Sequence, residues 1–129
     1  MLQDTKAFSG FSVKDLDEAK AFYGDMLGVR VTQDAMGLHL DIPSGMPVFV
    51  YQKDTHEPAT FTILNFVVTD IDTTVEELSA RGVIFEQYDL GGGAKTDEKG
   101  VLRGRAANMG PDIAWFKDPS GNILSILQD

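Results

Sequence analysis

Apolar and polar positions in the first half of the chain predict one strand, one helix and then three further strands. Residues 7–13 read as a strand, and Asp15 with Glu18 three positions later has the pattern of a helix N-cap. Apolar residues then recur at helical spacing as far as Gly28, a residue type that commonly ends helices. Turn residues separate the three remaining strand-like runs, which are residues 29–34, 38–42 and 47–53.

The second half of the chain repeats this order of elements. Residues 61–68 read as a strand, and Asp70 or Asp72 begins a helix that ends at Gly82. The three strands predicted after this helix are residues 83–88, 113–117 and 123–128.

The repeat is visible in the letters themselves. VKDLD at residues 13–17 returns as VTDID at residues 68–72, and a Pro-Ser-Gly turn occurs at both Pro43 and Pro119. Most of the additional residues of the second half fall in the glycine-rich segment 90–110. A segment of this length exceeds an ordinary connection, so it is either functional or simply a mobile excursion.

The sequence therefore predicts two tandem βαβββ units, at about residues 5–54 and 59–129. A unit of this size would not bury its sheet well alone, so we expect both to form a single domain, residues 1–129, of the α+β class.

Composition removes several classes of function. The net charge of −9 at pH 7 disfavours a nucleic-acid partner and would suit a cationic ligand, and the absence of cysteine excludes disulfides and thiolate sites. No apolar run approaches the roughly 20 residues of a membrane helix, and the first residues lack a signal-like pattern, so a cytoplasmic location is expected. The one basic concentration, Lys99, Arg103 and Arg105, is interpreted as part of a solvated loop, with a small positive site as the alternative.

The repeat, opened by DLDEAKAFYGDMLGV at residues 15–29 and closed by FKDPSGN at residues 116–122, resembles the vicinal oxygen chelate superfamily. This superfamily includes glyoxalase I, extradiol dioxygenases, methylmalonyl-CoA epimerase, and the bleomycin and fosfomycin resistance proteins. The resemblance covers nearly the whole chain. It implies that each unit curls its mixed sheet into a half-open cup that holds the site, and that the chain forms a homodimer.

Most enzymes of the superfamily hold a divalent metal with His or Glu from four strands. The resemblance places these ligands at Phe8, Phe49, Ile63 and Ser125, and a shift by one residue offers no better ligand. Three of the four are large hydrophobes that would leave a cation without compensation for its lost hydration. We therefore expect no metal and no cofactor.

The only histidines are His39 and His56. His39 and Asp41, two positions apart on a strand, could point the same way, and His56 stands beside Glu57. A relocated metal site through these residues is the weaker alternative. Otherwise both histidines are interpreted as structural or surface groups.

Without a metal, the cup becomes an apolar site with a few polar groups, as small-molecule pockets usually are. Tyr51 and Trp115 could stack on a planar ligand, and Asn65, two residues beyond Ile63, should share its face. These side chains could also simply fill the cup, although a buried indole still needs a partner for its N–H. The candidate ligand-binding residues are Phe8, Phe49, Tyr51, Ile63, Asn65, Trp115 and Ser125.

No catalytic residue stands out. Ser125 has no base that the sequence identifies, and a side-chain hydrogen bond within the turn is sufficient to explain Asp118. The favoured hypothesis is a metal-free protein that binds a largely apolar or aromatic small molecule, as bleomycin resistance proteins do. The alternatives are an enzyme of lyase, isomerase or dioxygenase type, with a relocated metal or acid–base residues, and a structural or regulatory module whose cups are filled.

Overall fold

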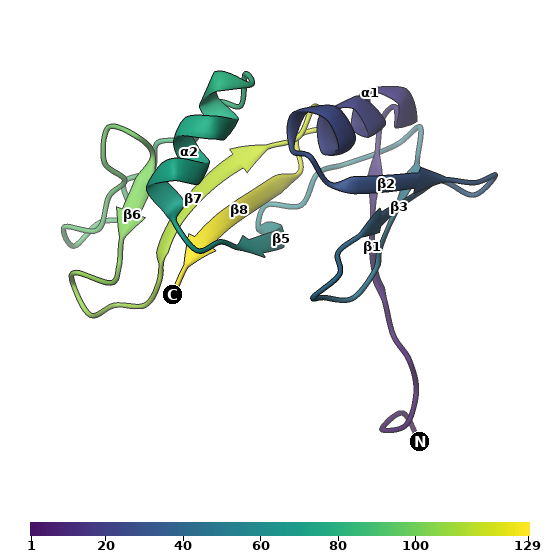
Figure 1. Cartoon of the computed structure of the whole chain (residues 1–129), viewed down its shortest axis with the longest axis horizontal. Helices are drawn as coiled ribbons and strands as arrows, with labels where there is room; N and C mark the ends of the chain where they lie inside the picture. Colours follow the sequence, from purple (N-terminus) through teal and green to yellow (C-terminus); the bar gives the residue numbers. More distant parts are fainter. The chain divides into compact units, whose positions relative to one another are not determined.

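The computed structural model describes residues 1–129, which divide into two compact units, Met1–Pro58 and Ala59–Asp129 (Figure 1). We call them unit 1 and unit 2. Each contains one four-stranded sheet with parallel and antiparallel pairs, so the predicted α+β fold of two tandem units is confirmed. That both units form one domain remains a prediction. No helix is long and apolar enough to cross a membrane.

Unit 1 has the predicted βαβββ order. In its sheet, β1 pairs in parallel with β4, β4 pairs antiparallel with β3, and β3 pairs antiparallel with β2. The elements are β1 (Ser9–Val13), α1 (Leu16–Lys20), η1 (Ala21–Met26), β2 (Arg30–Gln33), β3 (Leu38–Asp41) and β4 (Val48–Gln52).

The helix of unit 1 begins as predicted but does not continue as a regular α-helix. Asp15 is its N-cap and accepts a hydrogen bond from the Glu18 backbone N–H at 2.9 Å. After α1 the chain forms the π-helix η1, in which the Leu27 N–H bonds the Phe22 carbonyl, five residues back. Gly24 lies in this stretch, and glycine favours the regular helix less than other residues do. The predicted helix is therefore present, but its second half is a π-helix and not an α-helix.

Alternation along the strands of unit 1 separates a buried face from a more open one. Val48 and Val50 of β4 are buried, as is Leu40 of β3, and they belong to the core together with side chains of α1 and η1. The residues between them, such as Phe49, point to the opposite face of the sheet. Candidate site residues of unit 1 therefore lie on the face away from the helix.

Unit 2 repeats the architecture with a longer helix. Asp70 is the N-cap, with its carboxylate accepting from the Thr73 N–H at 3.1 Å, and Asp72 lies in the first turn. The strand order is β5-β8-β7-β6, with β5 and β8 parallel. The elements are β5 (Thr62–Val67), α2 (Ile71–Ala80), β6 (Val101–Arg103), β7 (Asp112–Lys117) and β8 (Ile123–Gln128).

The strand predicted at residues 83–88 was wrong. Among residues 83–88, only Phe85 pairs with a strand, through an isolated bridge to Phe116 of β7. The strand that pairs with β7 at this edge is β6, which lies inside the segment expected to be a loop. The chain leaves the edge of β7 after the bridge and returns to it at Val101. A strand of three residues is too short for alternation to reveal it in the sequence.

Candidate functional site

The four positions implied as metal ligands do not provide a metal site. Phe8 precedes β1 and is 68% exposed, and Phe49 lies in β4. Ile63 lies at a register shift in β5, and Ser125 is fully buried in β8. Among residues 1–129, no group of three or more His, Asp or Glu side chains could hold a metal ion. The donor set therefore does not fit the metal that the resemblance implies.

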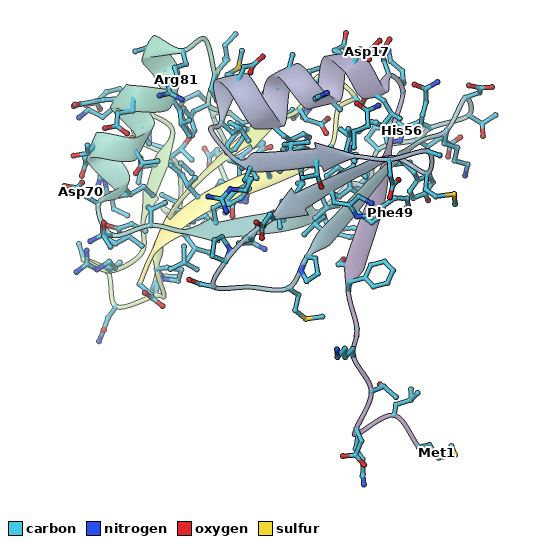
Figure 2. The ribbon with its side chains drawn as sticks, turned by 45° about the vertical axis from the view of Figure 1, so that its right-hand side comes forward. Met1, Asp17, Phe49, His56, Asp70 and Arg81 are labelled. Carbon is cyan, nitrogen blue, oxygen red and sulfur yellow. The ribbon has the colours of Figure 1, made fainter.

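In unit 1, three rings follow one another on the open face of the sheet. His39 lies directly opposite Phe49 in the antiparallel pair of β3 and β4, with ring centroids 5.3 Å apart. Phe49 in turn stacks on Tyr51, with centroids 5.8 Å apart and planes 18° from parallel. Tyr51 remains 39% exposed. We call His39, Phe49 and Tyr51 the aromatic row. Its central residue, Phe49, is labelled in Figure 2.

Glycines stand on both sides of the aromatic row. Gly10 is the partner of Phe49 in the parallel β1–β4 pair, and a Cβ at this position would lie 3.6 Å from the Phe49 Cβ. Gly37 has φ of +155°, and a Cβ there would clash with the Val50 carbonyl oxygen and lie 3.2 Å from the Phe49 ring. Glycine is therefore required at residue 37, and no side chain covers the Phe49 ring from either of these positions.

A fixed carboxylate holds the first ring of the row. The Asp34 Oδ2 lies 2.8 Å from the His39 Nε2, while Oδ1 accepts from the backbone N–H groups of Met36 and Gly37 at 2.8 and 3.2 Å. The hydrogen bonds from Met36 and from His39 lower the pKa of Asp34. The partner of His39 is thus Asp34 and not Asp41, whose carboxylate lies 3.5 Å from Arg30.

The second histidine has a structural contact. His56 Nδ1 lies 2.6 Å from the Ser12 Oγ of β1, and its backbone N–H bonds the Lys53 carbonyl at 3.0 Å. These bonds attach the segment after β4 to the first strand of the same unit. This arrangement agrees with the structural role expected for His56.

In unit 2, polar side chains on the corresponding face form hydrogen bonds with one another. Ser125 is paired with Asn65 of β5 on one side and with Trp115 of β7 on the other. The Ser125 Oγ–H donates to the Asn65 Oδ1 at 2.5 Å, and the Trp115 Nε1–H donates to the Thr62 Oγ at 3.1 Å. The indole N–H therefore has its partner within the unit. Sequence reasoning missed Thr62, because nothing in the local pattern pairs residues 53 positions apart.

The Trp115 ring is also covered by an aromatic neighbour. Tyr88 meets it edge-on, with centroids 5.4 Å apart and planes at 64°. Burial, with a contribution from the Glu86 charge, raises the pKa of Tyr88. The register shift between Thr62 and Leu64 leaves Ile63 at the irregularity, so its spacing of two from Asn65 no longer fixes a common face.

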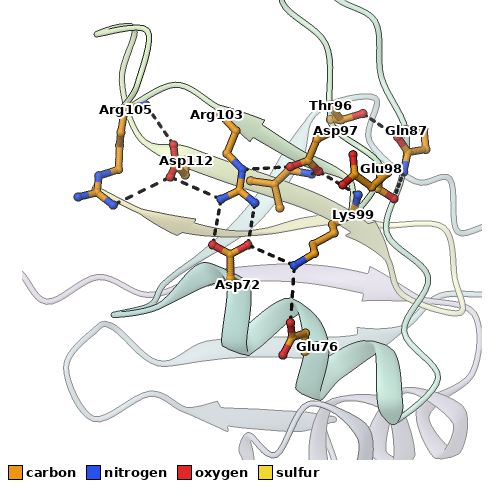
Figure 3. Close-up of polar contacts among 11 residues, drawn as sticks. Asp72, Glu76, Gln87, Thr96, Asp97, Glu98, Lys99, Arg103, Arg105 and Asp112 are labelled. Atoms are coloured by element: carbon orange, nitrogen blue, oxygen red, sulfur yellow. Dashed lines mark hydrogen bonds and ion pairs between the residues drawn. The ribbon is translucent and has the colours of Figure 1, made fainter.

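Lys99, Arg103 and Arg105 of segment 90–110 all lie near acidic side chains. Arg103 Nη1 and Nη2 donate to the two carboxylate oxygens of Asp72 at 3.0 and 2.7 Å, and its Nε donates to Asp97 at 3.0 Å (Figure 3). Lys99 lies 3.8 Å from Asp72 and 3.6 Å from Glu76. These cations remain partly solvated, as expected for a surface loop, but Lys99 and Arg103 also attach the segment to α2.

The pKa values of the acids reflect this pairing. The Arg103 guanidinium lowers the pKa of Asp72, and its bonds to the acids raise the pKa of Arg103 itself. Burial acts to raise the pKa of Asp97, but the Val101 N–H and Arg103 outweigh it, so this pKa is lowered. Arg105 lies 4.0 Å from Asp112, a buried carboxylate that also accepts the Arg105 backbone N–H at 3.0 Å.

Within unit 2, the turn before β8 is built as the sequence predicted. The Asp118 Oδ1 accepts from the Ser120 and Asn122 N–H groups, each at 2.9 Å, so the interpretation of Asp118 as a turn residue is confirmed. Three surface depressions, of about 480, 470 and 510 Å³, lie within the units. None of these three is lined by a residue predicted to bind the ligand.

Comparison with known families agrees with the geometry. The family model described as Glyoxalase/Bleomycin resistance protein/Dioxygenase superfamily matches residues 8–126, and the resemblance seen in the sequence is confirmed. No curated protein sequence matches the chain.

Similar solved structures include TnmS3, an antibiotic binding protein from Streptomyces sp. CB03234, with 21% identity, a TM-score of 0.68, and coverage of 99% of this chain and 98% of that one. A superfamily member from Sphaerobacter thermophilus DSM 20745 has 21% identity, a TM-score of 0.67 and coverage of 99% and 100%. The fosfomycin resistance protein FosX from Listeria monocytogenes has 14% identity, a TM-score of 0.67 and coverage of 99% and 95%. At these identities the likeness shows the fold alone.

Proposed function

The chain belongs to the glyoxalase/bleomycin resistance protein/dioxygenase superfamily, and we propose that it binds a small aromatic molecule without a metal ion. The aromatic row of unit 1 is the observation that carries this proposal. Its central residue, Phe49, stands at a position where the resemblance implies a metal ligand. An aromatic surface thus replaces a coordinating group.

The geometry of the row suits a planar ligand. Stacked or edge-on aromatic pairs contribute about 0.5–1.5 kcal/mol beyond the burial of their area. The ring of Phe49 has glycines at the neighbouring positions 10 and 37, so a flat molecule can approach it closely. Tyr51 adds a hydroxyl group at the exposed end of the row.

We assign the main ligand contact to unit 1 because the polar atoms of unit 2 are already used. Trp115 donates to Thr62, and Ser125 donates to Asn65. These residues are proposed to support the fold of unit 2.

The relatives support a small-molecule partner. TnmS3 is described as an antibiotic binding protein, and FosX as a fosfomycin resistance protein. We propose a ligand of comparable size with a planar ring. A homodimer and the absence of a nucleic-acid partner remain predictions.

Titration calorimetry with 2-methoxynaphthalene, a planar probe without a hydrogen-bond donor, tests the proposal. We expect Phe49→Ala to weaken binding at least about tenfold, since a loss near 1.4 kcal/mol corresponds to that factor. Gly10→Ala, which places a methyl group against Phe49, should also weaken it. Phe61→Ala removes an aromatic residue of unit 2 that is more accessible than Phe49, being 67% exposed, and should leave affinity unchanged.

The metal-free part of the proposal has its own test. Metal analysis of the purified protein should find no stoichiometric metal, and EDTA should not change the affinity for the probe. Loss of binding in EDTA, restored by one divalent metal, would contradict it. Equal affinity in the wild type and Phe49→Ala would instead exclude the aromatic row as the site.

A further inference from the structure

His39 is the one member of the aromatic row with ring nitrogens, and its carboxylate partner is held in place. The Asp34 side chain accepts two backbone N–H bonds through Oδ1, so Oδ2 is fixed opposite the imidazole, 2.8 Å from Nε2. A carboxylate held by backbone bonds orients the ring more firmly than one on a free side chain. The imidazole therefore has a defined position at the end of the row.

This contact also defines the tautomer. An ionised carboxylate accepts hydrogen bonds and cannot donate one, so the proton of the neutral imidazole must lie on Nε2. The lowered pKa of Asp34 agrees with an ionised side chain. The other nitrogen, Nδ1, is then a hydrogen-bond acceptor.

No side chain of the protein is found to donate to the Nδ1 of His39, whose side chain is 42% exposed. The ring lies 5.3 Å from Phe49, so this acceptor stands beside the surface on which a planar ligand would stack. Arg30 and Asp41, which are partners in the β2–β3 pair, contact each other at 3.5 Å and not His39.

We propose that the ligand carries a hydrogen-bond donor beside its ring, such as a phenolic hydroxyl or an aromatic amine, and that His39 accepts this hydrogen bond. The proposal rests on the ligand-binding function proposed above. Phe49 and Tyr51 then select for a planar ring, while His39 selects for the group attached to it. Asp34 acts as a positioning residue, because it contacts His39 and not the ligand.

A matched pair of probes tests this selection at pH 8, where imidazole side chains are ordinarily neutral. 2-Naphthol and 2-methoxynaphthalene share one ring system, but only the first has a donor. One net hydrogen bond corresponds to about a five- to tenfold difference in affinity, so 2-naphthol should bind more tightly by this factor.

The variant His39→Phe keeps an aromatic ring in the row and removes the acceptor. In this variant the two probes should bind with equal affinity, because the group that distinguishes them is gone. Retained binding of 2-methoxynaphthalene shows that the variant is folded. Asp34→Asn should reduce the preference for 2-naphthol without affecting the other probe.

The ¹⁵N NMR spectrum of the imidazole gives a readout that a purely structural role would not produce. The free protein should show His39 protonated at Nε2, and 2-naphthol should shift the Nδ1 resonance. A proton found on Nδ1, or equal affinity for the two probes, would overturn this inference while leaving the proposed function intact. If neither probe binds, both proposals fail.

Discussion

The fourth strands of the two units carry different chemistry at corresponding positions, each four residues beyond a turn glycine. β4 presents Phe49, whose ring lies in the open aromatic row, whereas β8 presents Ser125, which is fully buried and bonded to Asn65. The two units share an architecture, but one face keeps its aromatic surface accessible and the other satisfies its polar atoms internally. A repeated fold therefore does not imply a repeated site.

The largest expected difference concerns the aromatic residues of the two faces. Trp115→Ala should lower the free energy of unfolding by about 3 kcal/mol, because it removes a large packed ring and its hydrogen bond to Thr62. Phe49→Ala should cost less, about 1–2 kcal/mol, because its half-buried ring is smaller than the indole and makes no hydrogen bond. Urea denaturation measures both variants, and equal losses would contradict the comparison.

The next largest expected difference is in how much the ion pairs of each unit contribute to stability. Arg103→Gln should cost about 1–2 kcal/mol, less than a buried pair would, because the side chain is 37% exposed and solvent screens it. Arg30→Gln in unit 1 is the matched control. Its side chain is 75% exposed, and the change should cost at most about 0.5 kcal/mol in the same denaturation experiment.

The buried hydroxyl of unit 2 allows a finer test. Ser125→Ala should cost about 0.5–1 kcal/mol, because water can replace the hydroxyl at the exposed Asn65. Asn65→Ala should cost more, about 1–2 kcal/mol, because it leaves the buried Ser125 hydroxyl without its acceptor. If Ser125→Ala lowered the thermal stability more than Asn65→Ala did, the hydrogen bond between Ser125 and Asn65 would not support the fold. Neither variant should alter probe binding to unit 1.

The smallest expected effect is the loss of stability of unit 2 at acidic pH. The pKa values of Asp72 and Asp97 are lowered in the folded protein, so below about pH 4 the unfolded state binds more protons than the folded one. The stability that these carboxylates contribute is present above that pH and is lost as the pH falls through their folded pKa values. Thermal unfolding between pH 5 and pH 2 should therefore show a shallower acid dependence for Arg103→Gln than for the wild type.

Local features of the fold were accessible from the sequence. Asp15 and Asp118 were interpreted correctly because an N-cap or a turn carboxylate bonds backbone groups within four residues. The helix of unit 1 was less predictable. Its second half is a π-helix, and no periodicity in the sequence marks that change.

The candidate site was only partly predictable. Phe49 and Tyr51 share a face because strand residues two apart do so, and the structure brings their rings together. The contacts from Arg103 to Asp72 and from Trp115 to Thr62 join residues 31 and 53 positions apart. Contacts at such separations depend on how strands and helices align, which a single sequence does not reveal.

The sequence by itself determined the repeat, the order of most elements and the side chains at the four positions where the resemblance implies metal ligands. The tertiary structure alone decided that His39 is held by Asp34 and joins Phe49, and that β6 forms within segment 90–110. The physical reason is that alternation fixes a side chain relative to its own strand only. The register between strands, set by their hydrogen bonds and shifted at Ile63, decides which side chains meet.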